Sequence, residues 1–322
     1  MSSAPESLPT FVVTGASRGI GLATAEGLAR QGQRRIVIVC RDPERGRVAL
    51  ERVTRAARSS TTTELLVADL SSQRSVRQLA AEIAERCPRL DVLVHNAAVV
   101  TLERQLTEDG LETQLAVNHL APFLLTHLLR QPLAASGAAR VVVVASQVER
   151  QGTIRFDDLQ GEKAYDPLEA YYQSKLANVL FTYALAARWS EPEITVNCLH
   201  PGVVRTDLLA DMKAAYRRNL PATGEPPAKP SAQLLRAAWR LGKRAIRSGV
   251  DRFGPSHPDD DGPLTPEEGA AVPIFVATSP QLAGVSGHYF REMGEAKTSP
   301  GSYDIETRER LWSVSATLVG LS

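Results

Sequence analysis

Short apolar runs rich in valine and isoleucine alternate along the chain with stretches in which apolar residues recur at helical spacing. Runs of this kind, buried on both faces and separated by helices, are typical of a parallel sheet in a doubly wound α/β fold. The expected strands are Phe11–Thr14, Ile36–Cys40, Glu64–Ala68, Val92–His95, Val141–Ala145, Thr195–Leu199 and His288–Phe290. The expected helices lie near residues 19–31, 43–57, 72–86, 110–130, 168–188 and 266–278. The pattern predicts about seven strands joined by right-handed crossovers.

One region interrupts this alternation. Residues 208–264 have no strand pattern, and prolines precede their one helical stretch, Ser231–Arg247. The region has too few apolar residues to fold alone, so we interpret it as a helical insertion within a single domain, residues 1–322. It precedes the last predicted helix and strand, and we expect it to cover the substrate site as a lid.

The helical stretch of the insertion has a basic face. Its members recur at helical spacing: Arg236, Arg240, Lys243, Arg244 and Arg247. One interpretation is a solvated face whose apolar side packs on the domain. A second is peripheral contact with an anionic membrane or an acidic partner through residues 231–247. A third is recognition of an anionic group on the substrate.

The composition of the chain argues against several classes of function, among them nucleic-acid binding and metal binding. The net charge of +1 gives no reason to expect a nucleic-acid partner, and the histidines lack metal-ligand spacing. Met1–Pro9 lacks the layout of a signal peptide, and no window approaches the roughly 18 apolar residues of a membrane span. The three cysteines lie far apart in sequence. Free, buried thiols suit a reducing compartment, so we expect a cytoplasmic protein without a metal.

A glycine-rich loop joins the first predicted strand to the first predicted helix. It reads Thr14-Gly15-Ala16-Ser17-Arg18-Gly19-Ile20-Gly21. In this position such a loop makes a tight turn, brings backbone N–H groups close to a pyrophosphate and aims a helix dipole at it. We therefore expect a Rossmann-type nucleotide site at Thr14, Gly15, Ser17, Arg18, Gly19, Ile20 and Gly21. The alternative is a glycine-rich turn without a ligand.

The residues at the ends of later strands indicate which nicotinamide cofactor binds. Arg41 follows the second strand where an acidic residue would favour NAD, and Arg18 lies in the glycine loop. Two guanidinium groups suit a 2′-phosphate, so NADP is preferred and NAD is less favoured, although Asp42 is available to a ribose. Asp69-Leu70 ends the third strand, where adenine is expected. Asn96-Ala97-Ala98 ends the fourth with a small-residue turn that allows close passage of the cofactor.

Four polar residues suggest the chemistry. Tyr171 and Lys175 are four apart and share one helix face, so an ammonium group would lower the pKa of the phenol. Ser146, at the end of a strand, would hydrogen-bond a substrate oxygen. Asn118, in an apolar helix, needs a polar partner, for example a water leading to Lys175. Taken singly, each residue has a structural explanation; together they fall where one sheet would join them to the cofactor loop.

These motifs, with Tyr171-Tyr172-Gln173-Ser174-Lys175 and Pro201-Gly202, resemble the short-chain dehydrogenase/reductase family. Cys40-Arg41-Asp42 and the ending from Pro266 to Trp312 resemble its retinol-dehydrogenase-like branch. The resemblance implies that Tyr171 is the catalytic acid or base, supported by Lys175, Ser146 and Asn118. It also implies further cofactor contacts at Pro201, Gly202, Val204 and Thr206, the last to the nicotinamide carboxamide. Ala98 departs from the family pattern, which has glycine there.

The sequence thus predicts an NADP-dependent oxidoreductase that interconverts an alcohol and a ketone or aldehyde on a largely apolar small molecule. One alternative is a catalytically silent cofactor sensor or scaffold on the same fold, against which the intact Ser146, Tyr171 and Lys175 argue. Another is a sugar-nucleotide epimerase or dehydratase, which the spacing of the glycines disfavours. Helices 110–130 and 168–188 are candidates for pairing in a homodimer, as in many relatives.

Overall fold

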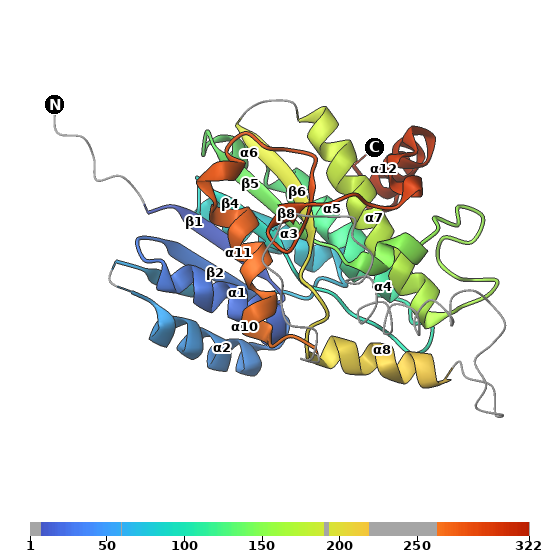
Figure 1. Ribbon diagram of the computed structural model, residues 1–322, viewed down its shortest axis with the longest axis horizontal. Coiled ribbons are helices and arrows are strands. Elements are labelled where there is room, and N and C mark those ends of the chain that lie inside the picture. The colour runs from blue at the N-terminus through green and yellow to red at the C-terminus, as the bar shows by residue number, and fades with distance from the viewer. Residues whose placement is uncertain (1–7, 59, 190–192, 219–262, 322) are drawn as a thin grey trace, which may run out of the picture.

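A computed structural model describes residues 8–58, 60–189, 193–218 and 263–321. Its centre is an eight-stranded sheet in the order β3-β2-β1-β4-β5-β6-β7-β8 (Figure 1). The strands are β1 Thr10–Thr14, β2 Arg35–Cys40, β3 Thr62–Val67, β4 Val92–His95, β5 Ala139–Val144, β6 Ile194–His200, β7 Tyr289–Arg291 and β8 Gly294–Glu295. The seven expected strands are confirmed, and all pair in parallel. The two-residue β8, which returns antiparallel to β7, was not expected.

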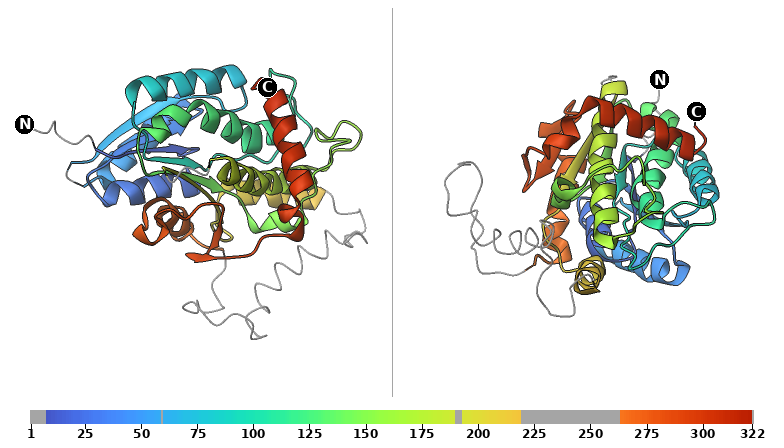
Figure 2. Two further views of the ribbon diagram at one scale, coloured as in Figure 1. Left: turned by 90° about the horizontal axis from the view of Figure 1, so that it is seen from above. Right: turned by 90° about the vertical axis from the view of Figure 1, so that its right-hand side faces the viewer.

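Helices cover both faces of the sheet. They are α1 Gly19–Arg30, α2 Pro43–Ala56, α3 Gln73–Arg86, α4 Thr113–Leu115, α5 Ala121–Leu128, α6 Arg130–Ala134, α7 Pro167–Arg188, α8 Asp207–Arg218, α10 Pro266–Gly269, α11 Ala271–Thr278 and α12 Ile305–Leu318. Short turns of 3₁₀ helix add η2 Gln147–Gln151, η4 Pro280–Leu282 and η5 Pro300–Tyr303. Residues of α1, α2 and α11 share one buried cluster, whereas α3, α5 and α7 share the other. The two layers are visible in Figures 1 and 2.

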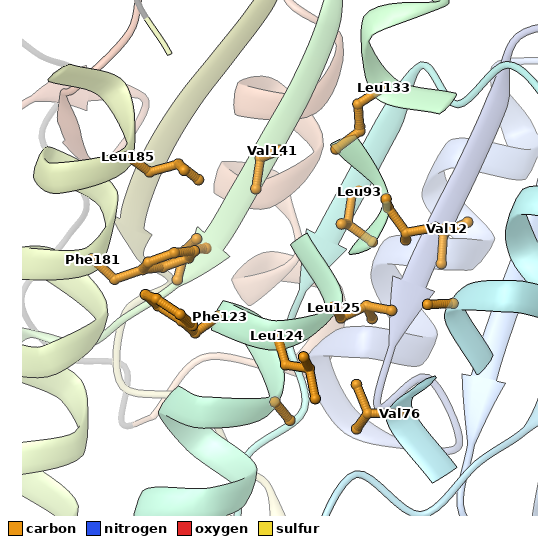
Figure 3. Packing of buried hydrophobic residues seen from close by; sticks show 14 of the residues in the cluster. Val12, Val76, Leu93, Phe123, Leu124, Leu125, Leu133, Val141, Phe181 and Leu185 are labelled. Atoms are coloured by element: carbon orange, nitrogen blue, oxygen red, sulfur yellow. The ribbon is translucent and has the colours of Figure 1, made fainter. Parts of the chain in front are cut away.

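The strands place alternate residues on opposite faces, which is why one apolar run serves two cores. In β1, Val12 belongs to the cluster with α3, α5 and α7, and Val13 belongs to the cluster with α1, α2 and α11. Figure 3 shows the first cluster, where Phe123 of α5 and Phe181 of α7 approach with ring centroids 5.5 Å apart beside Val141. Because every side chain on β1 is buried, the glycine loop that follows starts from a rigid strand end.

The order of strands reverses between β1 and β4, because the chain runs outward to β3 and then crosses back. The carboxyl ends of the parallel strands on both sides of this reversal face one crevice, the usual position of a nucleotide in such sheets. The loops after β1, β2, β3, β4, β5 and β6 carry most of the polar residues singled out above, and Asn118, Tyr171 and Lys175 lie on the helical segments that follow β4 and β5. The fold therefore gathers them at one edge.

The expected helix 110–130 is not continuous. It begins at Thr113 and contains a π-helical turn, Ala116–Leu120, before α5. Asn118 lies within this turn. Single π turns inside helices recur at functional sites because they re-aim a side chain without ending the helix. Apolar periodicity gives no sign of such a turn.

The insertion begins and ends at one point of the fold. Val204 forms a parallel bridge with Leu264, and the Leu264 N–H donates to the Val203 carbonyl at 2.8 Å. The helix α8 (Asp207–Arg218) forms the start of the insertion and was not among the expected helices. The expected helix Ser231–Arg247 lies outside the described residues. Within the described ranges, no helix combines the length and the apolar character needed to cross a bilayer.

The last helix, α12, packs on α5 and α7. The Trp312 ring stands edge-on to Phe123, with centroids 5.0 Å apart, and the Arg188 guanidinium lies 4.0 Å from the centroid of the Trp312 ring. Arg188 also pairs with Glu309, and His119 bonds Ser315 at 2.8 Å. The helices α5 and α7 correspond to the two candidates for dimer pairing. Around Phe123 and Arg188, their outer sides are thus covered by α12 of the same chain.

Candidate active site

The glycine loop after β1 fits closely against the loop after β4. Gly15 has φ of +67°, and a Cβ there would lie 2.6 Å from the Cα of Ala97. A Cβ on Gly21 would lie 2.3 Å from Nδ2 of Asn96. Both positions therefore require glycine, one for its backbone angle and for space, the other for space alone.

Thr14 and Asn96 fix the two loops to each other. The Thr14 hydroxyl donates to the Val94 carbonyl at 3.2 Å and accepts from the Asn96 and Ala97 N–H groups at 3.1 and 3.3 Å. The Asn96 amide nitrogen donates to the carbonyls of Thr14 and Gly15 at 3.0 and 3.2 Å. These hydrogen bonds engage the Thr14 hydroxyl and the Asn96 amide nitrogen and hold the glycine loop in one conformation against the loop after β4.

The start of α1 suits an anion. Arg18 is its N-cap residue, no side chain caps the helix, and the first turn holds no acidic residue. The free N–H groups of the first turn, which contains Ile20, and the helix dipole therefore face the loop of Gly15 and Ser17 without a competing carboxylate. Together with the two positions that exclude any side chain, this is an arrangement that fits a pyrophosphate.

The two arginines that the sequence assigned to a 2′-phosphate lie in the glycine loop and directly after β2. Arg41, directly after β2, is exposed, and Arg18 forms an ion pair with Asp207 at the start of α8. Asp42 caps α2 by accepting the Arg45 N–H at 3.0 Å. The carboxylate that the sequence left available to a ribose is thus used by a helix terminus.

Asp69 and Leu70 follow β3, as expected for an adenine-binding edge. One carboxylate oxygen of Asp69 accepts from the N–H and the hydroxyl of Ser71 at 2.9 and 2.7 Å. Leu70 is half-buried and packs against the main core. Both side chains are held by these contacts at the same edge as the glycine loop.

Tyr171 and Lys175 lie on α7, whose start is fixed by Pro167 and by the Asp166 cap. Both side chains are almost fully buried, at 3% and 2% exposed. The Lys175 ammonium donates to the Val144 carbonyl at 3.0 Å and lies 5.5 Å from the centroid of the Tyr171 ring. Val144 ends β5, two residues before Ser146, so the tyrosine, the lysine and the serine meet at the end of one strand.

Burial governs the protonation of this pair. It lowers the pKa of Lys175 to about 8 and raises the pKa of the Tyr171 phenol. The expected lowering of the tyrosine pKa by the lysine is therefore not seen in the protein alone, where the ammonium binds a backbone carbonyl and faces the ring. Desolvation, which disfavours both charged forms, outweighs their attraction.

Ser146 and Asn118 complete the set in different ways. The Ser146 oxygen accepts the Val148 N–H at 3.4 Å, which leaves its O–H available to a substrate. Asn118 is fully buried; its oxygen accepts the Val99 N–H at 2.8 Å and its amide donates to the Val99 carbonyl and to Ser174. Its described partners are therefore a loop backbone and the neighbour of Lys175, rather than Lys175 itself.

The segment after β6 closes the site against the glycine loop. A Cβ on Gly19 would lie 3.1 Å from Cγ2 of Thr206, so the two loops touch. Pro201 and Val204 are buried, and Gly202 has φ of +91°. The four residues that the resemblance assigned to cofactor binding thus lie in one short segment, Pro201 to Thr206, which contacts the glycine loop at Thr206.

Comparison with known proteins identifies the family. A family model for short chain dehydrogenases matches residues 9–217. The chain belongs to the short-chain dehydrogenase family. It is 38% identical over 324 residues to retinol dehydrogenase 14 of Homo sapiens, covering 97% of this chain and 86% of that protein. Members of this family are NAD(P)-dependent oxidoreductases acting on CH–OH groups, and so is this chain.

Solved structures agree with this family. A protein from Mycobacterium paratuberculosis described as uncharacterized aligns with a TM-score of 0.68 at 25% identity, covering 97% of this chain and 96% of that one. A structure described as an NAD(P)-dependent gluconate 5-dehydrogenase from Beutenbergia cavernae, with NADP bound, aligns with a TM-score of 0.62 at 25% identity, covering 88% and 94%.

Several residues at the dehydrogenase site were not singled out from the sequence. Ser174 links Asn118 to α7, Asp207 pairs with Arg18, and apolar residues of α8 pack beside Tyr171. The α8 residues had a usable signal, because Leu208, Met212 and Ala215 recur at helical spacing. Ser174 and Asp207 had none, since their roles depend on contacts with distant segments.

Proposed function

We propose that the protein is an NADP-dependent oxidoreductase that interconverts an alcohol and a ketone or aldehyde on a largely apolar small molecule. The observation that carries the proposal is the meeting of Ser146, Tyr171 and Lys175 at the end of β5, beside a glycine loop shaped for a pyrophosphate. In this proposal, Ser146 is the hydrogen-bond donor, Tyr171 the proton carrier and Lys175 the cation, next to the crevice at the sheet edge.

Each residue has a distinct task in this proposal. Ser146 donates its O–H to the substrate oxygen and orients the reacting carbon. Tyr171 gives a proton to that oxygen in reduction or takes one from it in oxidation. Lys175, held by the Val144 carbonyl, stabilises the phenolate and reaches toward a ribose hydroxyl. The nicotinamide, when bound, accepts or supplies the hydride.

Asn118 has a positioning task. Its amide holds the Val99 backbone, in the loop after β4, against Ser174 of α7. The loop after β4 also carries Asn96 and Ala97, which support the glycine loop. Asn118 therefore fixes the distance between the cofactor loop and the helix of Tyr171 and Lys175.

Three observations support NADP over NAD. Arg41 is exposed at the end of β2, Arg18 lies in the glycine loop, and Asp42 is engaged as a helix cap. Guanidinium groups bind a phosphate in a bidentate manner, whereas a free carboxylate at this place would repel it. The segment that contains Val204 and Thr206 would border the nicotinamide end of the bound cofactor.

The surroundings of Tyr171 favour an apolar substrate. An apolar cluster consists of Leu168, Tyr171, Tyr172, Ala215, Val100, Val148, Leu208, Met212 and Tyr216. Its members come from α7, α8 and the loops after β4 and β5, so the start of the insertion borders the place where a substrate would meet Tyr171. An apolar alcohol is also the substrate named for the retinol dehydrogenases. The three free, buried cysteines are compatible with a cytoplasmic enzyme.

The deciding experiment mixes the purified protein with NADPH or NADH and a panel of aldehydes and ketones, retinal among them, and follows the absorbance of the reduced nicotinamide. We expect turnover with NADPH that is greatest for apolar carbonyl compounds. Tight NADPH binding without turnover of any compound would instead indicate a cofactor sensor, and preferential turnover with NADH would overturn the NADP assignment.

A further inference from the structure

Two tyrosine hydroxyls are buried between α7 and α8 without a hydrogen-bond partner among the described residues. Tyr172 is 2% exposed, and its hydroxyl oxygen contacts neither a donor nor an acceptor. The hydroxyl of Tyr216, on α8, is in the same state. Both rings belong to the apolar cluster that contains Tyr171. The α8 helix lies beside the first turns of α7 in all views of Figures 1 and 2.

An unbonded buried hydroxyl is unfavourable, because it has lost its water and gained nothing in return. Folded proteins bond the large majority of such groups, so each exception calls for an explanation, and a functional role is one of them. Phenylalanine would fill the same space without this cost. Two such hydroxyls lie in one cluster beside Tyr171, and the described residues give neither of them a partner, which makes a bound substrate a candidate for that role.

The charges around Tyr172 restrict that partner. Burial raises the pKa of the Tyr172 hydroxyl, and the negative charges of Asp166, the N-cap residue of α7, and of Glu169, in its first turn, raise it further. A phenol in this field stays neutral, and the negative charges of Asp166 and Glu169 disfavour an anion close to it. The rest of the cluster is apolar, with Leu168, Leu208 and Met212 as its aliphatic members near α8.

We propose that Tyr172 and Tyr216 form a subsite for a second, neutral oxygen, a hydroxyl or a carbonyl, on an otherwise apolar substrate. This inference rests on the proposed function, because the reacting carbon is placed at Tyr171, the neighbour of Tyr172. The substrate class becomes an apolar alcohol or carbonyl compound with another oxygen, held between α7 and α8. Asp207 and Thr206 connect the start of α8 to the glycine loop, and Tyr216 lies near the end of the same helix, so cofactor and substrate would both border α8.

The test compares matched substrates and matched variants. The substrates are unbranched alkanals and the ω-hydroxyaldehydes of equal length, over a series of lengths, assayed with NADPH. The variants are Tyr172→Phe and Tyr216→Phe. The control is Tyr183→Phe, also on α7, whose hydroxyl is bonded to Thr298 at 2.9 Å.

In the wild type, we expect one length of hydroxyaldehyde to show a higher kcat/KM than its alkanal. Each subsite variant should lower that ratio about tenfold, the effect of one neutral hydrogen bond left unmade. Tyr183→Phe should leave the ratio unchanged. A ratio that neither Tyr172→Phe nor Tyr216→Phe alters overturns the subsite while leaving the proposed function intact.

Thermal unfolding without substrate gives an independent readout. Removing a hydroxyl that has no partner should leave the melting temperature unchanged or raise it in Tyr172→Phe and Tyr216→Phe, whereas Tyr183→Phe should lower it. If both single variants melted at lower temperature and the double variant lost no more than either of them, the two hydroxyls would bond each other, and the subsite would be overturned. Absence of turnover with every aldehyde would defeat the proposed function itself, and the subsite with it.

Discussion

Arg18 of the glycine loop forms an ion pair with Asp207, the first residue of α8. Both side chains are more than half exposed, at 57% and 62%, so the pair contributes little to stability. Its position matters more than its strength. The guanidinium proposed to bind the 2′-phosphate of NADP is held by the helix that borders the substrate site, and the phosphate would compete with Asp207 for it.

Asp207→Asn should therefore tighten NADP binding. Removal of the competing carboxylate frees Arg18, and an exposed pair of this kind corresponds to about a two- to fivefold change in Kd. Titration calorimetry with NADP and NAD would measure the effect, which should be confined to NADP. Asp211→Asn removes the same charge one turn further along α8 and is the control. Equal tightening in both variants would reduce the effect to overall charge.

Replacement of Arg18 and Arg41 together by alanine should weaken NADP far more than NAD. Charge-assisted hydrogen bonds are worth roughly 1.5–3 kcal/mol, about ten- to a hundredfold in affinity. Arg55→Ala, at the far end of α2, removes a guanidinium without approaching the site and should change neither affinity. A wild-type preference for NAD, or equal losses for both cofactors in the double variant, would remove the basis of the NADP assignment.

The apolar pattern predicted the strands of the sheet well, because each strand is recognised from a few consecutive residues. Each β-branched run needs only its own sequence to be recognised, and the glycine loop is placed by the strand before it and the helix after it. The meeting of Tyr171 and Lys175 with the end of β5 also follows from strand order, since the carboxyl ends of parallel strands share one edge.

What the pattern missed depends on contacts between distant segments. The π turn around Asn118 exists because that amide bonds Val99 and Ser174, one of them 56 positions away. The Asp42 carboxylate can either cap α2 or bind a ribose, and the sequence is compatible with both interactions; in the structure it caps the helix. The pairing of Arg18 with Asp207 joins residues 189 positions apart, beyond the reach of any periodicity.

Tyr171→Phe should abolish turnover and leave cofactor affinity nearly unchanged, because only the transferable proton is lost. Lys175→Met should lower both activity and cofactor affinity, because its ammonium serves the tyrosine and a ribose. Steady-state kinetics together with NADPH fluorescence titration separate the two effects. Tyr172→Phe is the matched control and should do much less to alkanal reduction; a larger loss there than in Tyr171→Phe would show that the catalytic tyrosine was assigned to the wrong position.

The packing of α12 bears on assembly. Because Trp312 of α12 packs on Phe123 of α5 and on Arg188 of α7, we expect the protein to sediment as a monomer rather than as a dimer paired through those helices. Trp312→Ala should cost about 2 kcal/mol of stability, less than a fully buried tryptophan, and should promote self-association by exposing Phe123 and Phe181. Sedimentation velocity is the measurement. A wild-type dimer cross-linked from α7 to α7 would contradict this account.

Three buried histidines should make the fold acid-sensitive. Burial lowers the pKa of His95 and His200 to about 3 and that of His119 to about 4. Their unfolded pKa lies near 6.5, so the unfolded chain binds more protons below that pH. The stabilisation is complete above about pH 6.5 and is lost as the pH falls toward the folded pKa values, at about 1.4 kcal/mol per histidine per pH unit.

Urea unfolding at a series of pH values measures this slope, which should reach about 4 kcal/mol per unit before other groups act. Glu112 and Glu149, whose pKa values burial raises, titrate in the opposite sense and offset part of it. The comparison with His200→Leu is therefore the cleaner test, because it removes one titrating group whose Nδ1 is unbonded among the described residues. The variant should lose about a third of the histidine slope. Parallel stability curves for the two proteins would mean that His200 is already free to take a proton in the folded state.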